Sequence, residues 1–379
     1  MRITNKMMIN NSKYWLSKQA EKLADAEIVS ASGKQINKPS DDPAAAAQIL
    51  EYRSEIAKYD QYQTNIGTAG TYIEMGEEVL DSTDSLIDQA LEIASDLASG
   101  SSDYTGTYLE SLKDLYNSIL AQGNTSLSSS YMYGGTEADS TPFSNEIALS
   151  SGSANVGFYL ASAASTVTLT IYDSSGTELG TYTTSGTGGS NDITWNGTYV
   201  DSAGNTLTAA NGDYTFSITA SDSTGNTVAS SCYQGNSGTK SFYISDGNSI
   251  EVNCNGGEIF TEALSSISDL ISAIEGYNNG TVDDATLAAT ASTVSDSLND
   301  AIDDIAGERV ALANIYSQLD VSTDKLDKLS ELLQEKLSTV ETGDTTEAAV
   351  DLSAQETAYE VTTEATAKIL NMPKLSDYI

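Results

Sequence analysis

Few side chains in this sequence are of the types that catalyse reactions. The chain contains no histidine, which removes the commonest general base and the commonest metal ligand. Cys232 and Cys254 lie too far apart in sequence for a Cys-x-x-Cys redox or zinc motif. They form either one disulfide or two free thiols, and we favour the thiols. The sequence therefore predicts a protein that is not an enzyme and that binds no cofactor or metal.

Aspartate-rich segments and two aromatic residues in the middle of the chain could bind ligands. The segments 173–176, 201–205 and 222–226 carry carboxylates, which bind calcium, yet none forms an Asp-x-Asp-x-Asp-Gly loop with a distal glutamate. We therefore expect solvated turns there. Trp195 and Tyr214 could bind a glycan, but aromatic residues at strand spacing more often fill a sheet core. We expect Trp195 to be buried.

The charge of the chain excludes several classes of partner. Asp and Glu number 54 against 17 Lys and Arg, a net charge of -37. A phosphate backbone or an anionic lipid surface would repel most of this molecule, so we expect no nucleic-acid partner. No window is apolar enough for a membrane span, and the N-terminal segment lacks the apolar run and cleavage site of a secretory signal. We therefore expect no membrane insertion and no Sec-type export.

Two long segments carry apolar residues at strict seven-residue spacing. Residues 43–98 have the composition of a helix and would extend roughly 85 Å as one helix. The second segment lies in the C-terminal half. A heptad seam has two apolar positions, and at the second of these the segment carries the polar residues Ser322 and Lys336. This mixture favours a helical bundle within one chain over a two-stranded zipper. The seam residues are Tyr52, Tyr59, Ile66, Ile73, Leu80, Ile87 and Ala94, and then Leu298, Ile305, Leu312, Leu319, Leu326, Leu333 and Val340.

A capping signal marks the start of the first long helix. Ser40, Asp41 and Asp42 precede Pro43, whose missing N–H would have no partner at the first helical position in any case. The two carboxylates also suit the positive end of the helix dipole. Three glycines between residues 67 and 76 weaken the helix, so we expect a bend or close packing there.

The composition changes abruptly after Phe143. Between residues 150 and 255, clusters of Gly, Ser, Thr and Asn separate short runs with period-two alternation, which predicts strands joined by hairpins. Short strands at such intervals favour a sandwich. Helical composition returns after Glu258, so the β segment is an insertion between two helical halves. The alternating runs lie at 167–171, 214–218, 242–244 and 250–252.

These patterns predict a mainly α rod of long helices built from both chain ends, with an inserted all-β sandwich. We place the terminal helices at 1–35 and 344–379, the helical bundle at 36–149 and 256–343, and the β insertion at 150–255. The terminal segments carry little apolar surface, so we expect neighbouring molecules to order them. The residues expected to pack in that assembly are Ile9, Leu16, Leu23, Leu352, Tyr359, Ile369 and Tyr378.

Four motifs carry a resemblance to a known family. Residues 31–44 join a Ser-Gly-Lys turn to the helix start at Pro43, and they resemble the N-terminal signature of the flagellin superfamily. The segment 131–143, the segment 256–260 and the ending 375–379 resemble the hook-filament junction proteins of that superfamily more than flagellins. Residues 166–230 are similar to the immunoglobulin-like domain of the hook-capping protein. Two departures are Gln35, where the family often has arginine, and the stretch 306–309, which replaces a more usual Gly-Ala-Arg.

The resemblance implies a structural subunit of the bacterial flagellum that forms a homo-oligomeric ring between hook and filament. It implies type III export to the extracellular flagellum without a cleaved signal, and a cytoplasmic chaperone on the C-terminal helix. It also implies contacts with the first hook-associated protein and with flagellin. The alternatives are a flagellin that builds the filament itself, or a surface adhesin that acts through its immunoglobulin-like insertion.

Overall fold

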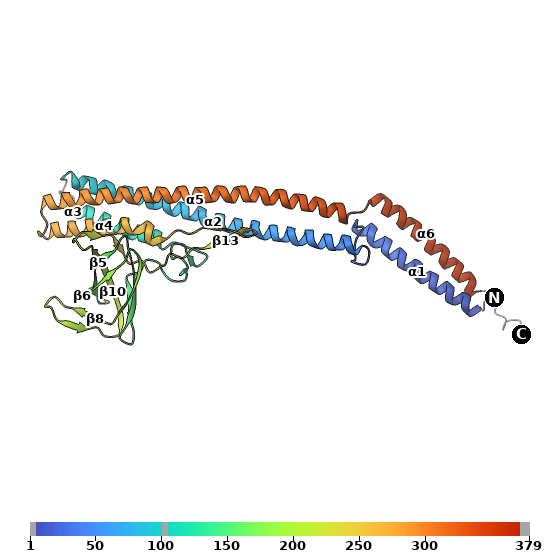
Figure 1. Cartoon of the computed structure of the whole chain (residues 1–379), viewed down its shortest axis with the longest axis horizontal. Coiled ribbons are helices and arrows are strands. Elements are labelled where there is room, and N and C mark those ends of the chain that lie inside the picture. The colour runs from blue at the N-terminus through green and yellow to red at the C-terminus, as the bar shows by residue number, and fades with distance from the viewer. Residues whose placement is uncertain (1–4, 101–104, 372–379) are drawn as a thin grey trace. The chain divides into compact units, whose positions relative to one another are not determined.

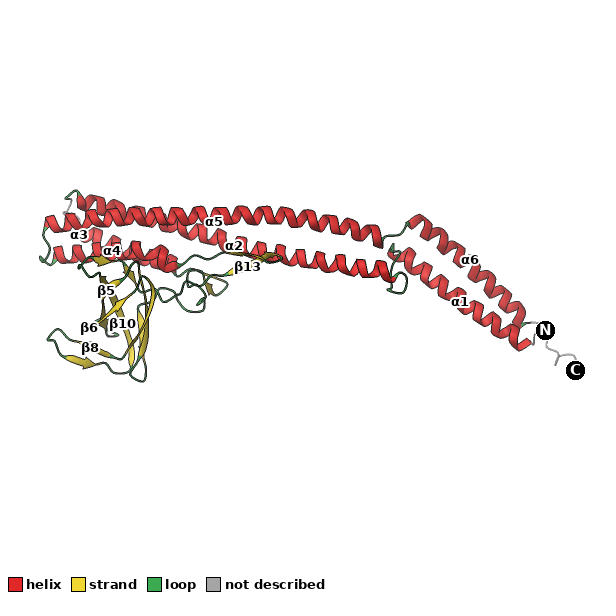
Figure 2. Cartoon of the chain, in the orientation of Figure 1, coloured by secondary structure: helices red, strands yellow, loops and turns green. Residues whose placement is uncertain are grey.

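The computed structural model describes residues 5–100 and 105–371 of the chain (Figure 1). These residues fall into two compact units. We call residues 1–63 with 324–379 the terminal unit, and residues 64–323 the central unit. All strands among the described residues belong to the central unit (Figure 2). Among the helices that the structure describes, none combines the length and the hydropathy that a membrane span requires.

Helices build the described part of the terminal unit. Helix α1 (Asn5–Ser32) lies beside helix α6 (Thr345–Leu370), as Figure 1 shows. The unit also contains the start of α2 (Pro43–Ala98) and the end of α5 (Asp284–Glu341). The observed bounds of α2 confirm the long helix that the sequence predicts from Pro43.

The same two long helices continue into the central unit, where they run antiparallel. Arg309 of α5 forms ion pairs with Glu77, Asp81 and Asp84 of α2 at N–O distances of 2.8, 2.8 and 3.5 Å. Two shorter helices, α3 (Thr105–Gly123) and α4 (Gly256–Asn278), pack against each other there. The central unit therefore contains a bundle of helices from both halves of the chain, as the sequence predicts (Figure 1).

The burial of the seam residues follows their position along α2 and α5. Those near the end of α5 and the start of α2 are half-buried, since two helices alone cover each other on one side only. Of the glycines between 67 and 76, only Gly76 packs closely, since a Cβ there would lie 3.3 Å from Leu312 Cδ1. The half-buried seam residues are Tyr52, Tyr59, Leu333 and Val340. The buried seam residues are Ile66, Ile73, Leu80, Ile87, Ala94, Leu298, Ile305, Leu312, Leu319 and Leu326.

The β insertion consists of two antiparallel sheets around one apolar core. The larger sheet has the order β11-β10-β5-β6-β8-β9 with β3 paired to β10, and the smaller has the order β12-β4-β7. The predicted burial of Trp195 is confirmed: its side chain is fully buried in this core and its Nε1 donates to Thr198 O at 2.6 Å. The strands are β3 (Glu146–Leu149), β4 (Ala154–Leu160), β5 (Ala164–Tyr172), β6 (Glu178–Gly186), β7 (Gly189–Trp195), β8 (Thr198–Val200), β9 (Thr206–Thr208), β10 (Gly212–Ser221), β11 (Thr227–Val228) and β12 (Ser230–Ser231).

Two further hairpins lie outside these sheets. Strands β1 (Ser126–Leu127) and β2 (Ser130–Tyr131) form one, and β13 (Ser241–Ser245) and β14 (Asn248–Glu251) form the other. The sequence predicts the last two strands but assigns them to the sandwich. In the structure they pair with each other, and the ring of Phe242 lies against that of Tyr72 of α2, with centroids 5.9 Å apart and an interplanar angle of 42°.

Aspartate side chains hold three hairpin turns of the insertion. Asp173, Asp201 and Asp222 each accept backbone N–H bonds from residues two and four positions later. The hydroxyl of Ser175 lowers the pKa of Asp173 most, ahead of the N–H bonds, whereas the N–H of Asn205 contributes most at Asp201. The pKa of Asp222 is lowered to about 2. In Asp222 the hydroxyl of Thr224 contributes most to the shift. The three aspartates thus form the turns that the sequence predicts.

Candidate assembly site

The segment between α1 and α2 is held by its own aspartates. Asp42 Oδ1 accepts from the N–H groups of Ala44 and Ala45 at 2.9 and 3.1 Å, so Asp42 caps α2 ahead of Pro43. Asp41 Oδ2 instead accepts from the N–H of Lys38 at 2.8 Å and from that of Asn37. These bonds, the first above all, lower the pKa of Asp41. The sequence predicts both as helix caps, but Asp41 stabilises the preceding turn because its side chain points back along the chain.

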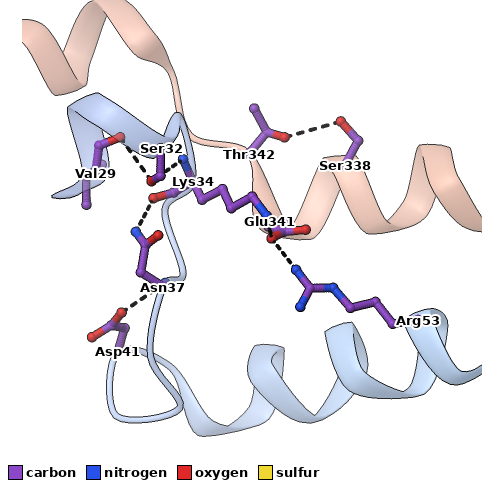
Figure 3. A network of polar contacts seen from close by, with 9 residues as sticks. All are labelled: Val29, Ser32, Lys34, Asn37, Asp41, Arg53, Ser338, Glu341 and Thr342. Atoms are coloured by element: carbon purple, nitrogen blue, oxygen red, sulfur yellow. Dashed lines mark hydrogen bonds and ion pairs between the residues drawn. The ribbon is translucent and has the colours of Figure 1, made fainter.

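A buried carboxylate connects this segment to the far end of the chain (Figure 3). The side chain of Glu341, at the end of α5, is only 9% exposed. Its Oε1 forms ion pairs with Lys34 Nζ at 2.5 Å and with Arg53 Nη2 at 2.6 Å. The backbone adds bonds from Gln35 N to Glu341 O at 2.8 Å and from Gly343 N to Gly33 O at 3.1 Å. We name this set of contacts the Glu341 network. It joins the α1–α2 turn to the α5–α6 turn within the terminal unit.

Sequence reasoning missed the Glu341 network. Arg53 and Glu341 are separated by 288 positions, and no local pattern connects them. Gln35, noted as a departure from the family, bonds to Glu341 through its backbone N–H, which any residue except proline provides. The departure at Gln35 therefore leaves this contact intact.

A groove opens beside the Glu341 network. Its volume is about 300 Å³. Apolar side chains line it together with Lys34, Lys38 and Arg53, each of which has about half of its side chain exposed. Leu50 lines the groove and is nevertheless 63% exposed. The apolar lining consists of Ile36, Pro39, Ala46, Ile49 and Leu50.

The structure places the predicted assembly residues of α1 and α6 on the faces where these two helices meet. Gln19 lies on the same face of α1 and its Nε2 donates to Oε1 of Gln355 on α6 at 2.7 Å. The predicted residues are half-buried within one chain, and the rest of each side chain is exposed to solvent. They are Ile9, Leu16 and Leu23 on α1 and Leu352, Tyr359 and Ile369 on α6; Tyr378 lies outside the described residues.

A second set of apolar residues on α1 and α6 faces solvent. Val350 and Val361 of α6 are 66% and 61% exposed, and Met7, Tyr14 and Trp15 of α1 have similar values. Isolated exposed apolar residues are common on protein surfaces, but among the residues of this helix pair whose burial is described, only Ala26 and Thr366 are buried. The outward faces of α1 and α6 are therefore available for packing against other molecules.

Two sequence motifs meet where the insertion leaves the bundle. The ring of Tyr133 lies 5.0 Å from that of Phe260, and Phe143 lies 5.7 Å from the same ring, measured between centroids. Tyr233 Oη donates to Tyr133 O at 2.7 Å. Gly257 is required here, since a Cβ on it would lie 2.4 Å from the Tyr159 ring. We name these residues the aromatic neck.

The remaining candidates for chemistry are buried thiols. Cys232 and Cys254 are both free and buried. Burial raises both pKa values, that of Cys232 to about 11, so the thiolate is disfavoured. Within residues 5–100 and 105–371, no group of three or more His, Cys, Asp or Glu side chains is arranged to hold a metal ion.

Family models match three parts of the chain. The bacterial flagellin N-terminal helical region matches residues 3–137, and the bacterial flagellin C-terminal helical region matches residues 296–378. The FlgD Ig-like domain matches residues 144–230, which include strands β3 to β11. Comparison with curated proteins gives no significant match.

Several solved structures resemble the chain. A flagellar hook-associated protein from Vibrio parahaemolyticus is 15% identical with a TM-score of 0.51, and the match covers 80% of this chain and all of that one. FlgL from Bacillus cereus is 11% identical (76% and 99% covered, TM-score 0.46). Hook-associated protein 3 from Legionella pneumophila is 13% identical (77% and 98% covered, TM-score 0.43). The Vibrio structure shares the fold of this chain.

Proposed function

We propose that this chain forms the ring between hook and filament. The chain belongs to the flagellin superfamily, because the two helical regions of bacterial flagellins together match more than half of it. The observation that carries this proposal is the placement of the two regions at the two ends of the chain, with the FlgD Ig-like domain between them. The fold shared with the Vibrio hook-associated protein supports the junction over the filament.

Assembly proceeds through the terminal helices in this proposal. α1 and α6 cover one face of each other and leave Tyr14, Trp15, Val350 and Val361 exposed. Helices with so few buried residues gain packing when copies associate, so ordering of the ends is coupled to ring formation. Isolated, dilute protein should show fast amide exchange in both terminal helices. Slow exchange there would contradict the coupling.

The partners of the proposed subunit follow from its place in the flagellum. It contacts the first hook-associated protein on the proximal side and flagellin on the distal side. A cytoplasmic chaperone holds its C-terminal helix before type III export to the extracellular flagellum. Its role is mechanical, with no catalytic step, and the immunoglobulin-like domain occupies an outer position because both chain ends are used in the tube.

Immunogold labelling of intact flagella tests the proposal. A single labelled band beside the hook is expected for a junction subunit. Flagellin is the second candidate, because both terminal family models describe flagellin regions, and it would give label along the whole filament. Deletion of the gene separates the two further: hooks should remain while flagellin is shed into the medium, whereas loss of a filament subunit shortens or removes filaments.

A further inference from the structure

Acidic and basic residues are distributed unevenly between the two units. Of the 17 Lys and Arg residues, 14 belong to the terminal unit and three to the central unit. Of the 54 Asp and Glu residues, 20 belong to the terminal unit and 34 to the central unit. The central unit therefore carries a net charge of -31 and the terminal unit only -6.

The three basic residues of the central unit are already engaged within it. Lys113 Nζ pairs with Glu275 at 2.7 Å, and Arg309 contacts three carboxylates of α2. The Nζ of Lys240 lies 4.1 Å from the centroid of the Tyr72 ring and donates to its hydroxyl. Contact between the central units of two copies is therefore strongly repulsive, because neither unit offers free basic side chains to pair with the carboxylates of the other.

The groove beside the Glu341 network has the opposite character. Lys34 and Arg53 share one carboxylate, so one positive charge at the groove is left without a counter-charge. Lys38 pairs with Asp25 at 3.1 Å, but both side chains are more than half exposed, so that pair contributes little and can be exchanged. Asp41 and Asp42 do not line the groove, because their carboxylates bind backbone N–H groups. The groove thus combines uncompensated positive charge with apolar lining residues.

We propose that this groove is a docking site for the acidic central unit of a second copy of the chain. The occupant is an acidic segment from residues 64–323 that places a carboxylate between Lys38 and Arg53 and an apolar side chain over Leu50. Charge complementarity selects this occupant, since the central unit holds 34 carboxyl residues and the terminal unit is nearly neutral. The contact is heterologous, because a groove in one unit meets a different unit of the next copy.

This inference rests on the proposed ring and adds to it. It specifies that neighbouring copies are staggered, with unlike units in contact, so that fewer central units face one another directly. It also predicts that the contact weakens as salt increases, because the screening length between exposed charges falls from about 10 Å at 0.1 M ionic strength to about 3 Å at 1 M.

Photo-crosslinking from Leu50 tests the docking site in assembled flagella. A benzophenone amino acid replaces Leu50 in cells, flagella are purified and irradiated, and species of twice the subunit mass are digested and sequenced. We expect crosslinks to peptides from residues 64–323 of a second copy. The matched control carries the same group at Leu332, which is 48% exposed in the same unit but lies outside the groove, and should not give those peptides.

A charge reversal provides an independent measurement. Lys38→Glu leaves the ion pairs of Glu341 intact, and we expect it to reduce incorporation into flagella by about three- to tenfold, the equivalent of losing one charged contact. Lys336→Glu is the control, because Lys336 is an exposed lysine of the terminal unit outside the groove and should leave incorporation unchanged. Circular dichroism of both purified variants confirms that each is folded.

The possible results separate this inference from the proposed function. Crosslinks from Leu50 to the terminal unit of a second copy, to another flagellar protein, or to no second molecule would overturn the docking site while leaving the ring standing. Equal incorporation of both lysine variants would also overturn it. If the subunit is absent from purified flagella, the proposed function fails and the docking site fails with it.

Discussion

Alanine at Gly257 and alanine at Gly307 should change the stability of the central unit in opposite directions. Both glycines lie in helices, α4 and α5, where alanine is intrinsically favoured over glycine by about 0.5–1 kcal/mol. At Gly307 no atom lies within 4 Å of the added Cβ, so this gain is realised in full. Gly307→Ala should therefore raise the free energy of unfolding by that amount.

At Gly257 the geometry of the aromatic neck reverses the sign. The added Cβ would lie 2.4 Å from Tyr159 Cδ2 and 2.8 Å from Tyr233 Cδ1, which is well inside van der Waals contact. Tyr233 is fully buried and its hydroxyl is bonded to Tyr133 O, so it cannot move aside without losing that bond. Overpacking of this kind costs about 1–3 kcal/mol, which exceeds the propensity gain.

Urea denaturation of the two variants, followed by far-UV circular dichroism, measures both changes. We expect a net loss of about 1–2 kcal/mol for Gly257→Ala and a gain for Gly307→Ala. If Gly257→Ala is as stable as the parent protein, the close approach of α4 to the Tyr159 ring is wrong. If both variants lose stability equally, the comparison reports a general effect of substitution and the reasoning fails.

Glu341→Gln should lower the free energy of unfolding by about 1 kcal/mol, a value kept small because Lys34 and Arg53 are half exposed. It should also speed amide exchange at Gln35 and Gly343, whose N–H groups bond within the Glu341 network. Glu335→Gln, at an exposed site of α5, should change neither quantity. The pKa of Asp222 is lowered to about 2 on folding, so the stabilisation that its carboxylate gives the turn is complete above the unfolded pKa near 3.8 and is lost as pH falls through 2. Amide protection in this turn should fall over the same pH range. Asp222→Ala should lack this pH dependence. Cys232 and Cys254 should resist iodoacetamide in native protein at neutral pH and both react after denaturation without reductant; a single disulfide would leave both unlabelled.

Local signals in the sequence were sufficient for the main elements of the fold. The cap at Asp42 and the proline at position 43 mark the start of α2, and both act through atoms within three residues of the helix start. The heptad pattern identifies the buried face of α2 and α5, because a helix repeats the same direction roughly every seven residues. Asp-rich turns identify the hairpins, since each aspartate bonds to N–H groups no more than four residues away.

Sequence periodicity alone does not identify the surface that covers an apolar stripe. The stripe from Ile9 to Leu23 predicts contacts between copies, and within one chain these side chains are half-buried on a helix that lies beside α6. A helix pattern shows that one face is apolar but does not name the surface that covers it. On α6, Val350 and Val361 fall outside the seven-residue spacing of Leu352 and Tyr359, so only their observed exposure identifies them.

By itself the sequence determined the long helices, the position of the inserted strands and the resemblance to flagellins, because periodicity, caps and turns act over a few residues. The tertiary structure alone decided that Glu341 would be shared by Lys34 and Arg53, that Gly257 would lie against Tyr159, and that β13 and β14 would leave the sandwich. Each of these depends on segments distant in sequence meeting at atomic separations. Such meetings are set by how whole elements pack, and short-range sequence patterns do not encode that packing.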